Sequence, residues 1–382
     1  MDLIIIQPYL NSRGGAERVV QKLSEKFNAP IYTFSYKPGQ TFSEFGECDI
    51  REIRPRASLS AIDLLAPIDR NSRIRSVGKA GLHMLGMKIR EDYDILNPHL
   101  PPSEWIRNRN ERVCWFCHGQ NAGFKGDGAM LLGRTAGEKI VLKTGKAAYR
   151  AVESRLVKRI EKICTCSEYT KGNIEASFGR DDVSVAHPGV EPGEFSCGAF
   201  DRYFLCVSRI SPEKRIEFAI RAFKEFDRGG KWKLVIAGQL ADMPRNRQYL
   251  ESLKELAGGA NVSFEINRQD AEMKRLYSDC YAFLCPSIAE DWGIVVLEAM
   301  ASSKPVIAAN RGGPTESVKD GETGFLVSSQ REMAGKMSYL AQNPSENEAM
   351  GKKGRKRVAQ NYTWGVFLEK MGRAYRETAK KA

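Results

Sequence analysis

The sequence YAFLCPSIAEDWGIVVLEAMASSKPVIAA, residues 281–309, contains two short apolar runs separated by a polar loop and a longer apolar segment. The runs Ala282 to Pro286 and Pro305 to Ala308 are typical of buried strands, and Ile294 to Ala301 between them is predicted to be a helix. A strand, a helix and a strand in this order form the unit of a parallel sheet. This stretch therefore predicts an α/β fold.

The same alternation of apolar runs and helical segments continues in both directions along the chain. Further strands are predicted at Leu3 to Gln7, Tyr93 to Asn97, Val113 to His118, Ile163 to Cys166, Tyr203 to Val207, Lys233 to Ala237 and Val262 to Glu265. Further helices are predicted at Ala16 to Phe27, Lys139 to Lys162, Ile216 to Phe226, Asp270 to Asp279 and Gln330 to Asn343. The pattern indicates doubly wound parallel sheets covered by helices on both faces.

The alternation is interrupted at His187-Pro-Gly-Val-Glu-Pro-Gly193, where two prolines and two glycines cannot continue a helix or a central strand. A chain of 382 residues also favours two domains over one. We expect Rossmann-like domains at residues 1–187 and 194–361. Ligands of such sheets bind at the carboxyl ends of the strands, which predicts a cleft between the domains.

Composition sets limits on function. Hydrophobic residues make up 42% of the chain and charged residues 28%, as in a globular protein, and no apolar run reaches the length of a membrane span. The net charge of +12 favours a polyanionic partner: nucleic acid, an anionic bilayer or a phosphate-bearing molecule. The nine cysteines are an odd number and no export signal precedes the first strand, so we expect thiols in a cytoplasmic protein.

Two turns between a strand and a helix have features that are typical of phosphate-binding sites. Gly14 and Gly15 follow the first predicted strand, where glycines allow a ligand close to the backbone and a helix N-terminus favours an anion. Arg209 and Lys214 follow the strand at residues 203–207, and both cations could reach one diphosphate. Taken alone, each turn is equally compatible with an ordinary connection.

Two carboxylates mark a third candidate site. Glu290 lies in the loop after a predicted strand, and Glu298 lies within the apolar helix that follows. An unpaired carboxylate is costly to bury, so Glu298 is expected to have a partner, and a ribose with two hydroxyls would suit it. The N-terminus of this helix, near Gly293 and Ile294, adds backbone donors.

The segment SIAEDWGIVVLEAMASSKPVIAANRGGPTESVKDGETGFLV, residues 287–327, resembles the donor-site core of the retaining glycosyltransferases of family 4, also called group 1. Their hallmark is a Glu, seven residues and a second Glu, as at Glu290 and Glu298. The resemblance extends to the R-x4-K turn at Arg209 and Lys214, to the glycine turn and to the strand end at His118. It implies a GT-B fold, two Rossmann-like domains facing across a cleft, with the last helix, residues 362–382, packing back on the first domain.

The resemblance also implies a role for each site residue. Arg209 and Lys214 would bind the donor diphosphate, with Gly14 and Gly15 approaching from the other domain. His118 and Glu290 would be the catalytic residues near the transferred hexose, and Glu298 would hold the ribose. The remaining donor contacts would come from Asp291, Trp292, Gly293 and Ile294 and, around the base, from Gly238, Ile266 and Asn267. This chain departs from the family at three positions. The family often has Phe at the position of Trp292, and it often has Gly at the positions of Arg215 and Ser303.

The motifs are most similar to those of mannosyltransferases that use GDP-mannose to extend lipid-linked glycans. The resemblance implies transfer with retention of configuration and without a metal ion or other cofactor. Asp92-Tyr-Asp94 has the D-x-D form of metal-dependent transferases, but no other metal ligands flank it.

Two basic segments, 51–90 and 125–162, each carry a net charge of +6. A basic amphipathic surface favours an anionic membrane, which would suit a polyprenyl-linked acceptor and a peripheral position on the inner face of the cell membrane. A solvated face of the domain is the alternative. The basic run from Lys352 to Arg357 is expected to be a charged helix face.

Other functions remain open at this point. A glucosyl, galactosyl or N-acetylhexosaminyl transferase would use a UDP-sugar instead, and a GT-B epimerase would act on the nucleotide sugar alone. A basic nucleic-acid-binding protein is the alternative outside the enzymes, but no recognition helix supports nucleic acid as a partner. A dinucleotide-dependent dehydrogenase is disfavoured because no G-x-G-x-x-G follows either strand.

Overall fold

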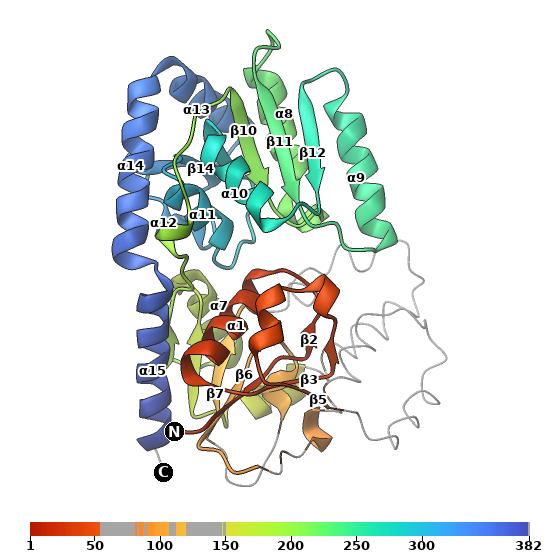
Figure 1. The fold of residues 1–382 in the computed structure, drawn as a ribbon, viewed down its shortest axis with the longest axis vertical. Helices are drawn as coiled ribbons and strands as arrows, with labels where there is room; N and C mark the ends of the chain where they lie inside the picture. Colours follow the sequence, from red (N-terminus) through yellow and green to blue (C-terminus); the bar gives the residue numbers. More distant parts are fainter. Residues whose placement is uncertain are drawn as a thin grey trace. The chain divides into compact units, whose positions relative to one another are not determined.

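The computed structural model describes residues 1–53, 81, 84–87, 89, 91–106, 112–119, 147 and 150–380. The chain forms two compact units (Figure 1). The first consists of Met1–Ala186 together with Leu368–Ala382, and the second consists of His187–Phe367. Each unit has its own parallel sheet and its own apolar core.

The sheet of the first unit is parallel throughout its described strands. Its strands are β1 (Leu3–Ile6), β3 (Ile31–Thr33), β5 (Ile50–Glu52), β6 (Ile95–Pro98), β7 (Cys114–Cys117), β8 (Lys162–Thr165) and β9 (Val183–Val185). They pair in the orders β5-β3-β1-β6 and β7-β8-β9, and a parallel bridge between Leu96 and Val113 joins the two groups. A separate pair, β2 (Tyr9–Leu10) and β4 (Ser35–Tyr36), extends from the carboxyl ends of β1 and β3.

The helices of the first unit begin at the carboxyl ends of its strands. They include α1 (Gly15–Phe27) and α7 (Glu168–Phe178), with 3₁₀ turns at η1 (Pro38–Gln40), η2 (Ser43–Glu47) and η4 (Ser103–Trp105). The side chain of Ser167 caps α7 by accepting a hydrogen bond from the backbone N–H of Thr170. The last helix, α15 (Trp364–Lys380), contributes its residues from Leu368 onwards, and Tyr375 packs edge-on against Phe27.

The second unit contains a six-stranded parallel sheet in the order β12-β11-β10-β13-β14-β15. The strands are β10 (Tyr203–Val207), β11 (Lys233–Gly238), β12 (Val262–Ile266), β13 (Ala282–Cys285), β14 (Val306–Ala309) and β15 (Gly324–Val327). The four strands β10, β11, β13 and β14 are buried along almost their whole length, as expected for a sheet covered on both faces.

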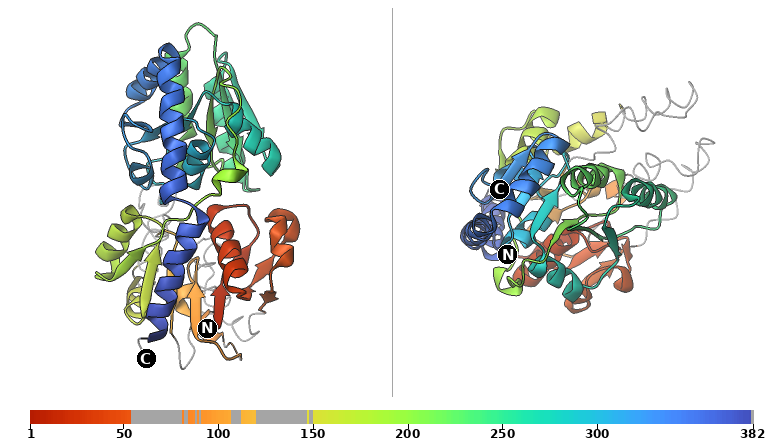
Figure 2. Two further views of the ribbon diagram at one scale, coloured as in Figure 1. Left: turned by 60° about the vertical axis from the view of Figure 1, so that its left-hand side comes forward. Right: turned by 90° about the horizontal axis from the view of Figure 1, so that it is seen from above.

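Helices alternate with the strands of this second sheet. They are α8 (Ile216–Phe226), α9 (Pro244–Ala257), α10 (Asp270–Asp279), α11 (Ile294–Ala301), α12 (Pro314–Ser317), α13 (Gln330–Gln342) and α14 (Pro344–Asn361), with 3₁₀ turns η5 (Pro192–Glu194) and η6 (Pro212–Lys214). The helix α8 packs against α13, and α14 packs against α11 and the edge strand β15 (Figure 2). Apolar side chains on one face of α8, such as Ile216, Ile220 and Phe223, belong to the core between this helix and the sheet.

The α/β class and the GT-B fold predicted from the sequence are confirmed. Helices α8, α10 and α11 and the strand β10 have the predicted bounds. The prediction of one helix from Lys139 to Lys162 is wrong at its end, because Lys162 already belongs to β8. Residues 150–157 of that segment are helical, and much of its first half lies outside the described residues. The predicted cleft between the two domains remains a prediction.

The cysteines are thiols, as predicted. All nine are free, and seven of them are buried in the two units. Burial raises the pKa of Cys206 and of Cys280 to about 12, so both stay protonated at neutral pH. The described helices include none that is long and apolar enough to cross a membrane.

Candidate active site

In the second unit, a lysine and a glutamate from neighbouring strand ends form an ion pair. Lys214 ends the turn η6 after β10, and Glu290 lies in the loop after β13. Because β10 and β13 are adjacent and parallel, their carboxyl ends meet at the same edge of the sheet. The Nζ of Lys214 lies 2.6 Å from Oε2 of Glu290, and the two side chains are 14% and 17% exposed. Such a partly buried pair is held more strongly than one on the surface.

Arg209 lies on the same turn as Lys214. It comes two residues after the end of β10, and its side chain is exposed. Ile210 follows Arg209, and its backbone N–H donates a hydrogen bond to the carbonyl of Gln239. This bond fixes the turn against the end of β11. Lys214 is therefore held by Glu290, whereas Arg209 stands in solvent at the same edge of the sheet.

The second carboxylate, Glu298, lies on α11 next to a buried phenol. It is partly buried, and Tyr277 beside it is 2% exposed. Burial raises the pKa of Tyr277 well above its usual value, and the neighbouring Glu298 carboxylate raises it further. The Tyr277 phenol therefore stays neutral beside Glu298.

Three glycines allow two loops to meet around Glu290. Gly312 and Gly293 have positive φ angles, 84° and 88°. A Cβ on Gly312 would lie 2.5 Å from the carbonyl oxygen of Glu290, and one on Gly313 would lie 2.4 Å from Cα of Trp292. The backbone N–H of Gly313 donates to that same Glu290 carbonyl at 2.9 Å. The loop before α12 thus fixes the backbone on which Asp291 and Ile294 also lie.

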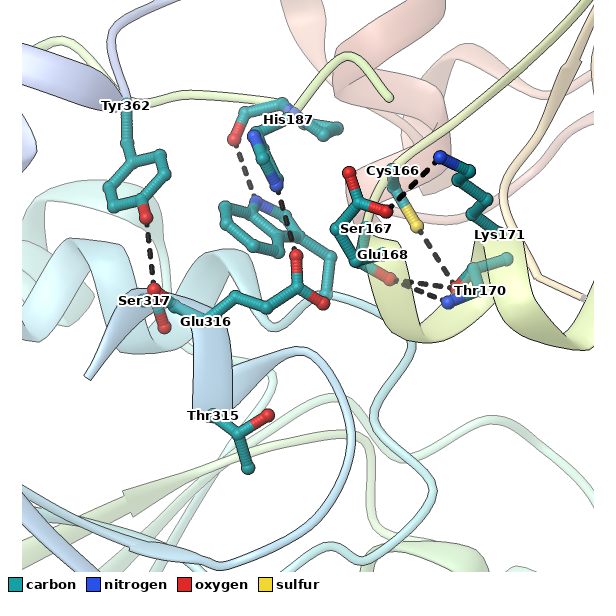
Figure 3. Close-up of polar contacts among 12 residues, drawn as sticks. Cys166, Ser167, Glu168, Thr170, Lys171, His187, Thr315, Glu316, Ser317 and Tyr362 are labelled. Carbon is teal, nitrogen blue, oxygen red and sulfur yellow. Dashed lines mark hydrogen bonds and ion pairs between the residues drawn. The ribbon is translucent and has the colours of Figure 1, made fainter. Parts of the chain in front are cut away.

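The ring of Trp292 lies in an aromatic cluster within this unit, together with the rings of His187 and Tyr362, which Figure 3 labels. Its Nε1 donates to the carbonyl of Pro188 at 2.7 Å, and its ring lies 4.4 Å from that of His187 and 5.3 Å from that of Tyr362. His187 in turn contacts Oε2 of Glu316 at 3.1 Å. Because its indole is 4% exposed, Trp292 can offer a ligand its backbone and little of its side chain.

The predicted base-binding residues lie at the ends of β11 and β12. Gly238 and Ile266 are paired across the two strands. Gly238 has a φ of 143°, and a Cβ there would lie 1.9 Å from the carbonyl oxygen of Ser208. Asn267, at φ 56°, accepts a hydrogen bond from the Leu240 N–H through its side chain at 3.0 Å. These residues shape the backbone of the edge where a base is predicted to bind.

In the first unit, the glycine turn carries an acidic residue that the sequence analysis did not single out. Gly14 is the N-cap of α1, and Glu17 in the first turn is 5% exposed. Its Oε1 accepts from Ser12 Oγ at 2.6 Å, and a Cβ on Gly14 would lie 2.7 Å from its Oε2. A carboxylate therefore already occupies the positive end of this helix, next to Gly15, and would repel a phosphate that approached while it was ionised.

The predicted catalytic residue His118 follows β7 and belongs to a chain of hydrogen bonds. Its Nε2 lies 2.8 Å from Nδ1 of His99, which follows the adjacent strand β6. The Nε2 of His99 lies 2.8 Å from Oδ1 of Asn97. The same Oδ1 accepts from the hydroxyl of Tyr375 on α15 at 2.8 Å. Burial lowers the pKa of His118 to about 3 and, together with the charge of His118, lowers that of His99 well below its usual value.

A residue that follows the carboxyl end of β8, the strand next to β7, contacts the backbone of His118. Cys166, one residue after β8, donates through its thiol to the carbonyl of His118 at 3.4 Å. The same thiol lies 3.6 Å from the hydroxyl of Thr170, which bonds to Ser167 at the start of α7 (Figure 3). Lys171 on this helix pairs with Glu168 at 3.5 Å. The backbone at His118 is therefore fixed by β7, β8 and α7 together.

The aspartates of the D-x-D segment lie at the opposite end of their strand. Asp94 directly precedes β6, and its Oδ2 accepts from the backbone N–H of Asp2 at 2.8 Å. It also lies 3.6 Å from the amino group of Met1. Asp94 thus lies at the amino end of β6, whereas His99 and His118 follow the carboxyl ends of β6 and β7.

Most of both basic segments lies outside the described residues. Of the segment 51–90, the structure describes 51–53, 81, 84–87 and 89, and of 125–162 it describes 147 and 150–162. In the run from Lys352 to Arg357, both arginines donate hydrogen bonds to backbone carbonyls. Arg355 donates to the carbonyls of Pro192 and Phe195, and Arg357 to those of Glu316 and Ser317. These guanidinium groups hold α14 against neighbouring loops.

Comparison with known proteins identifies the family that the second unit resembles. Residues 199–357 match the family of glycosyl transferases group 1. This part of the chain, less than half of its length, is similar to that family, and the similarity supports a glycosyltransferase.

Relatives and solved structures extend the similarity over almost the whole chain. The alpha-1,3/1,6-mannosyltransferase ALG2 of Dictyostelium discoideum is 24% identical over 97% of this chain and 97% of that protein. The structure of a sucrose-phosphate synthase from Thermosynechococcus elongatus is similar with a TM-score of 0.77, at 18% identity, over 99% of this chain and 98% of the other. HepE of Anabaena, solved in complexes with UDP and with UDP-glucose, has a TM-score of 0.74 at 16% identity, over 99% of this chain and 100% of the other.

At two places in the first unit, sequence reasoning identified some of the residues and missed their partners. It identified His118 but not His99, Asn97 or Tyr375, and it identified Gly14 and Gly15 but not Glu17. The signal for His99 was present, because the Asn97-Pro-His99 segment ends a predicted strand in the same way as His118 does. No local signal could have found Tyr375, which is 278 residues away from Asn97 along the chain.

Proposed function

We propose that this glycosyltransferase moves a hexose from a nucleotide sugar to a glycan acceptor, with mannose from GDP-mannose as the donor. The pairing of Lys214 with Glu290 at the carboxyl ends of β10 and β13 carries the proposal. It brings a cation and a carboxylate within 2.6 Å of each other in the part of the chain that matches group 1. One donor molecule bears both groups that these side chains suit, a diphosphate and a hexose with several hydroxyls.

Transfer breaks the bond between the anomeric carbon and the diphosphate oxygen, and that oxygen takes the electron pair. Lys214 and Arg209 would stabilise the charge that develops there, and the N-terminus of α11 would add backbone N–H groups. The acceptor hydroxyl forms the new bond to the same carbon, and its proton passes to the departing phosphate. In our proposal this attack occurs on the face that the phosphate leaves, so configuration is retained. Glu290 would hold the hexose and Glu298 the ribose.

The choice of mannose rests on the ALG2 relatives. The Dictyostelium mannosyltransferase aligns with 97% of this chain, so the similarity extends over both compact units. A UDP-sugar transferase is the second candidate, because HepE was solved with UDP-glucose. A GT-B epimerase is a third, and it would need no acceptor.

A donor screen tests the proposal and separates the candidates. Thermal unfolding of the full chain is measured with GDP-mannose, UDP-glucose, UDP-N-acetylglucosamine and ADP-glucose, each with and without EDTA. A donor present at 100 times its Kd is expected to stabilise the protein by about 2.7 kcal/mol. Stabilisation by GDP-mannose that persists in EDTA supports a mannosyl donor site without a metal. Stabilisation by UDP-sugars alone would show that the donor is a UDP-sugar and not GDP-mannose. If no donor stabilises the protein, the proposed donor site is wrong.

Turnover then distinguishes transfer from epimerisation. The preferred donor is incubated with and without a polyprenyl-linked oligosaccharide, and both the products and the anomeric configuration are followed by NMR. Transfer requires the acceptor and yields an α-linked product from an α-linked donor. Conversion of the donor in the absence of acceptor would instead support the epimerase.

We also propose that the acceptor is presented at an anionic membrane surface on the cytoplasmic side, to which the protein binds peripherally. The basic character of segments 51–90 and 125–162 supports this, since lysine and arginine near an anionic leaflet each contribute about 1 kcal/mol of attraction. Flotation with vesicles of phosphatidylglycerol, compared with vesicles of phosphatidylcholine, measures the effect. Equal recovery with both lipids at low salt would remove the membrane from the proposal.

A further inference from the structure

The hydrogen bonds around His99 determine which ring nitrogen of His118 carries the proton. The side chain of Asn97 provides the starting point, because its Nδ2 donates to the carbonyl of Cys114 at 2.6 Å. A carbonyl can only accept, so the amide group of Asn97 has one orientation and its Oδ1 faces the other way. That oxygen accepts from the hydroxyl of Tyr375 at 2.8 Å and lies 2.8 Å from Nε2 of His99.

An amide oxygen is an acceptor, so the Nε2 of His99 must be the donor in this contact. His99 is fully buried, and it stacks near Phe116 with ring centroids 5.6 Å apart. A neutral imidazole is favoured in such an environment, since burying an uncompensated cation is costly. A neutral ring with a proton on Nε2 has a lone pair on Nδ1.

The lone pair on Nδ1 of His99 faces Nε2 of His118 at 2.8 Å. A hydrogen bond at that distance needs a proton, and His99 cannot supply it, so it belongs to His118. A neutral His118 that is protonated on Nε2 has a lone pair on its own Nδ1. Within the described part of the chain, no hydrogen-bond partner contacts that Nδ1.

We infer that Tyr375, Asn97 and His99 are positioning residues that hold His118 in the Nε2–H tautomer, so that its Nδ1 accepts a hydrogen bond from a hydroxyl of the bound sugar. The inference on the sugar hydroxyl rests on the proposed function, whereas the inference on the tautomer does not. In this state His118 is an acceptor towards the ligand and supplies no proton to the leaving group. The C-terminal helix α15 takes part in the site through Tyr375, which acts through Asn97 and not by contact with the ligand.

The tautomer is measured directly by NMR on the full chain labelled with ¹⁵N-histidine. The sequence has four histidines, so single replacements of His118, His99 and His187 assign the spectrum. Correlations between the ring nitrogens and ring protons distinguish Nε2–H from Nδ1–H. We expect both His99 and His118 to be Nε2–H at pH 7, with no change down to pH 5. An Nδ1–H tautomer at His118, or its protonation near its ordinary pKa, would overturn the inference.

Two substitutions at His99 separate tautomer control from simple packing. In His99→Asn, the amide oxygen can take the place of Nδ1 and still accept from His118, whereas His99→Leu offers no acceptor. We expect His118 to stay Nε2–H in H99N and to become a mixture of tautomers in H99L. The same tautomer in both variants would overturn the inference, because packing alone would then suffice. If H99L does not fold, the tautomers of His118 in the wild type and in H99N test the inference.

Activity provides the second readout. We expect kcat/KM to fall about three- to tenfold in H99L, the size of one neutral hydrogen bond, and to recover in H99N. If the wild-type tautomer is as expected but no donor is used, the proposed function fails and the control of His118 stands. If transfer is observed and both His99 variants have wild-type kcat/KM, the hydroxyl contact is wrong and the proposed function stands.

Discussion

The two units use the same part of the same fold for different physical purposes. At the carboxyl edge of the first sheet, Asn97, His99 and His118 are joined by hydrogen bonds between neutral groups. At the carboxyl edge of the second sheet, Lys214 and Glu290 form an ion pair. Neutral groups fix the direction of a hydrogen bond without repelling a charged ligand, and fixed charges stabilise charge that develops in a reaction. A Rossmann-like sheet thus positions its strand ends, and the residues that follow each strand supply the chemistry.

The ion pair should be the more sensitive of the two sites. Replacing Lys214 by Ala removes the cation proposed for the diphosphate and leaves Glu290 partly buried without its partner. We expect kcat/KM to fall about a thousandfold, equivalent to about 4 kcal/mol. Lys254→Ala is the matched control, because that lysine forms an exposed pair with Glu251 on α9. Donor turnover is measured for both, and a loss below tenfold in K214A would contradict the charged role of this edge.

The backbone around Glu290 can be disturbed without changing any charge. In Gly312→Ala, the added Cβ would meet the Glu290 carbonyl at 2.5 Å at a φ of 84°, so the loop must move. We expect the free energy of unfolding of the second unit to fall by about 3 kcal/mol, with a loss of donor binding. Gly335→Ala is the control, since nothing lies within 4 Å of a Cβ at that helical position. Urea unfolding that gives the two variants equal stability would show that the loop is not fixed as described.

The neutral histidines should make the first unit sensitive to acid. The pKa of His118 is lowered to about 3 in the folded state, so between that value and about 6.5 the unfolded chain binds the additional proton. Stability is therefore retained above about pH 6.5 and is lost as the pH falls. We expect about 2 kcal/mol less stability at pH 5 than at pH 7 from His118, and a further loss from His99 in the same direction.

Urea unfolding at the two pH values measures this effect. In the control His118→Asn the contribution from that ring is absent, and the pH dependence should be correspondingly smaller. An unchanged dependence in H118N would mean that His118 titrates normally in the folded protein.

The smallest effect concerns two positions at which this chain departs from its family. Arg215 and Ser303, where the family often has Gly, have φ angles of 52° and 56°. A side chain costs about 1 kcal/mol in this conformation, so Ser303→Gly should stabilise the second unit by about that amount. Ser302→Gly should destabilise it, because Ser302 has a φ of −80° and gains nothing from glycine. Thermal unfolding compares the neighbouring variants, and stabilisation by S302G alone would contradict the backbone explanation.

Elements with a strong local pattern were predictable from sequence. Helices α8, α10 and α11 have the predicted bounds because their apolar positions repeat over two or more turns and because loops with glycine, proline or polar residues bound them. The end of the segment at Lys162 was not predictable in the same way. A run of lysine, arginine and glutamate suits a helix, and the pairing of β8 with β7 and β9 overrides that preference.

Site residues were predictable one at a time and not as groups. Lys214 and Glu290 are 76 residues apart, and each had its own signal at the end of a strand. Their contact depends on β10 and β13 being neighbours in the sheet, although β11 and β12 lie between them in sequence. Glu17 was not predicted as a site residue because acidic residues are common in the first turn of a helix.

The sequence by itself determined the α/β class, the strand ends that carry chemistry and the resemblance to group 1, because these depend on local periodicity and on motifs of contiguous residues. The tertiary structure alone decided which side chains meet. The order of strands in each sheet pairs Lys214 with Glu290 and His118 with His99, and α15 brings Tyr375 to Asn97. The proton position on His118 follows from that last contact chain, since a tautomer is set by partners in space and leaves no trace in the order of residues.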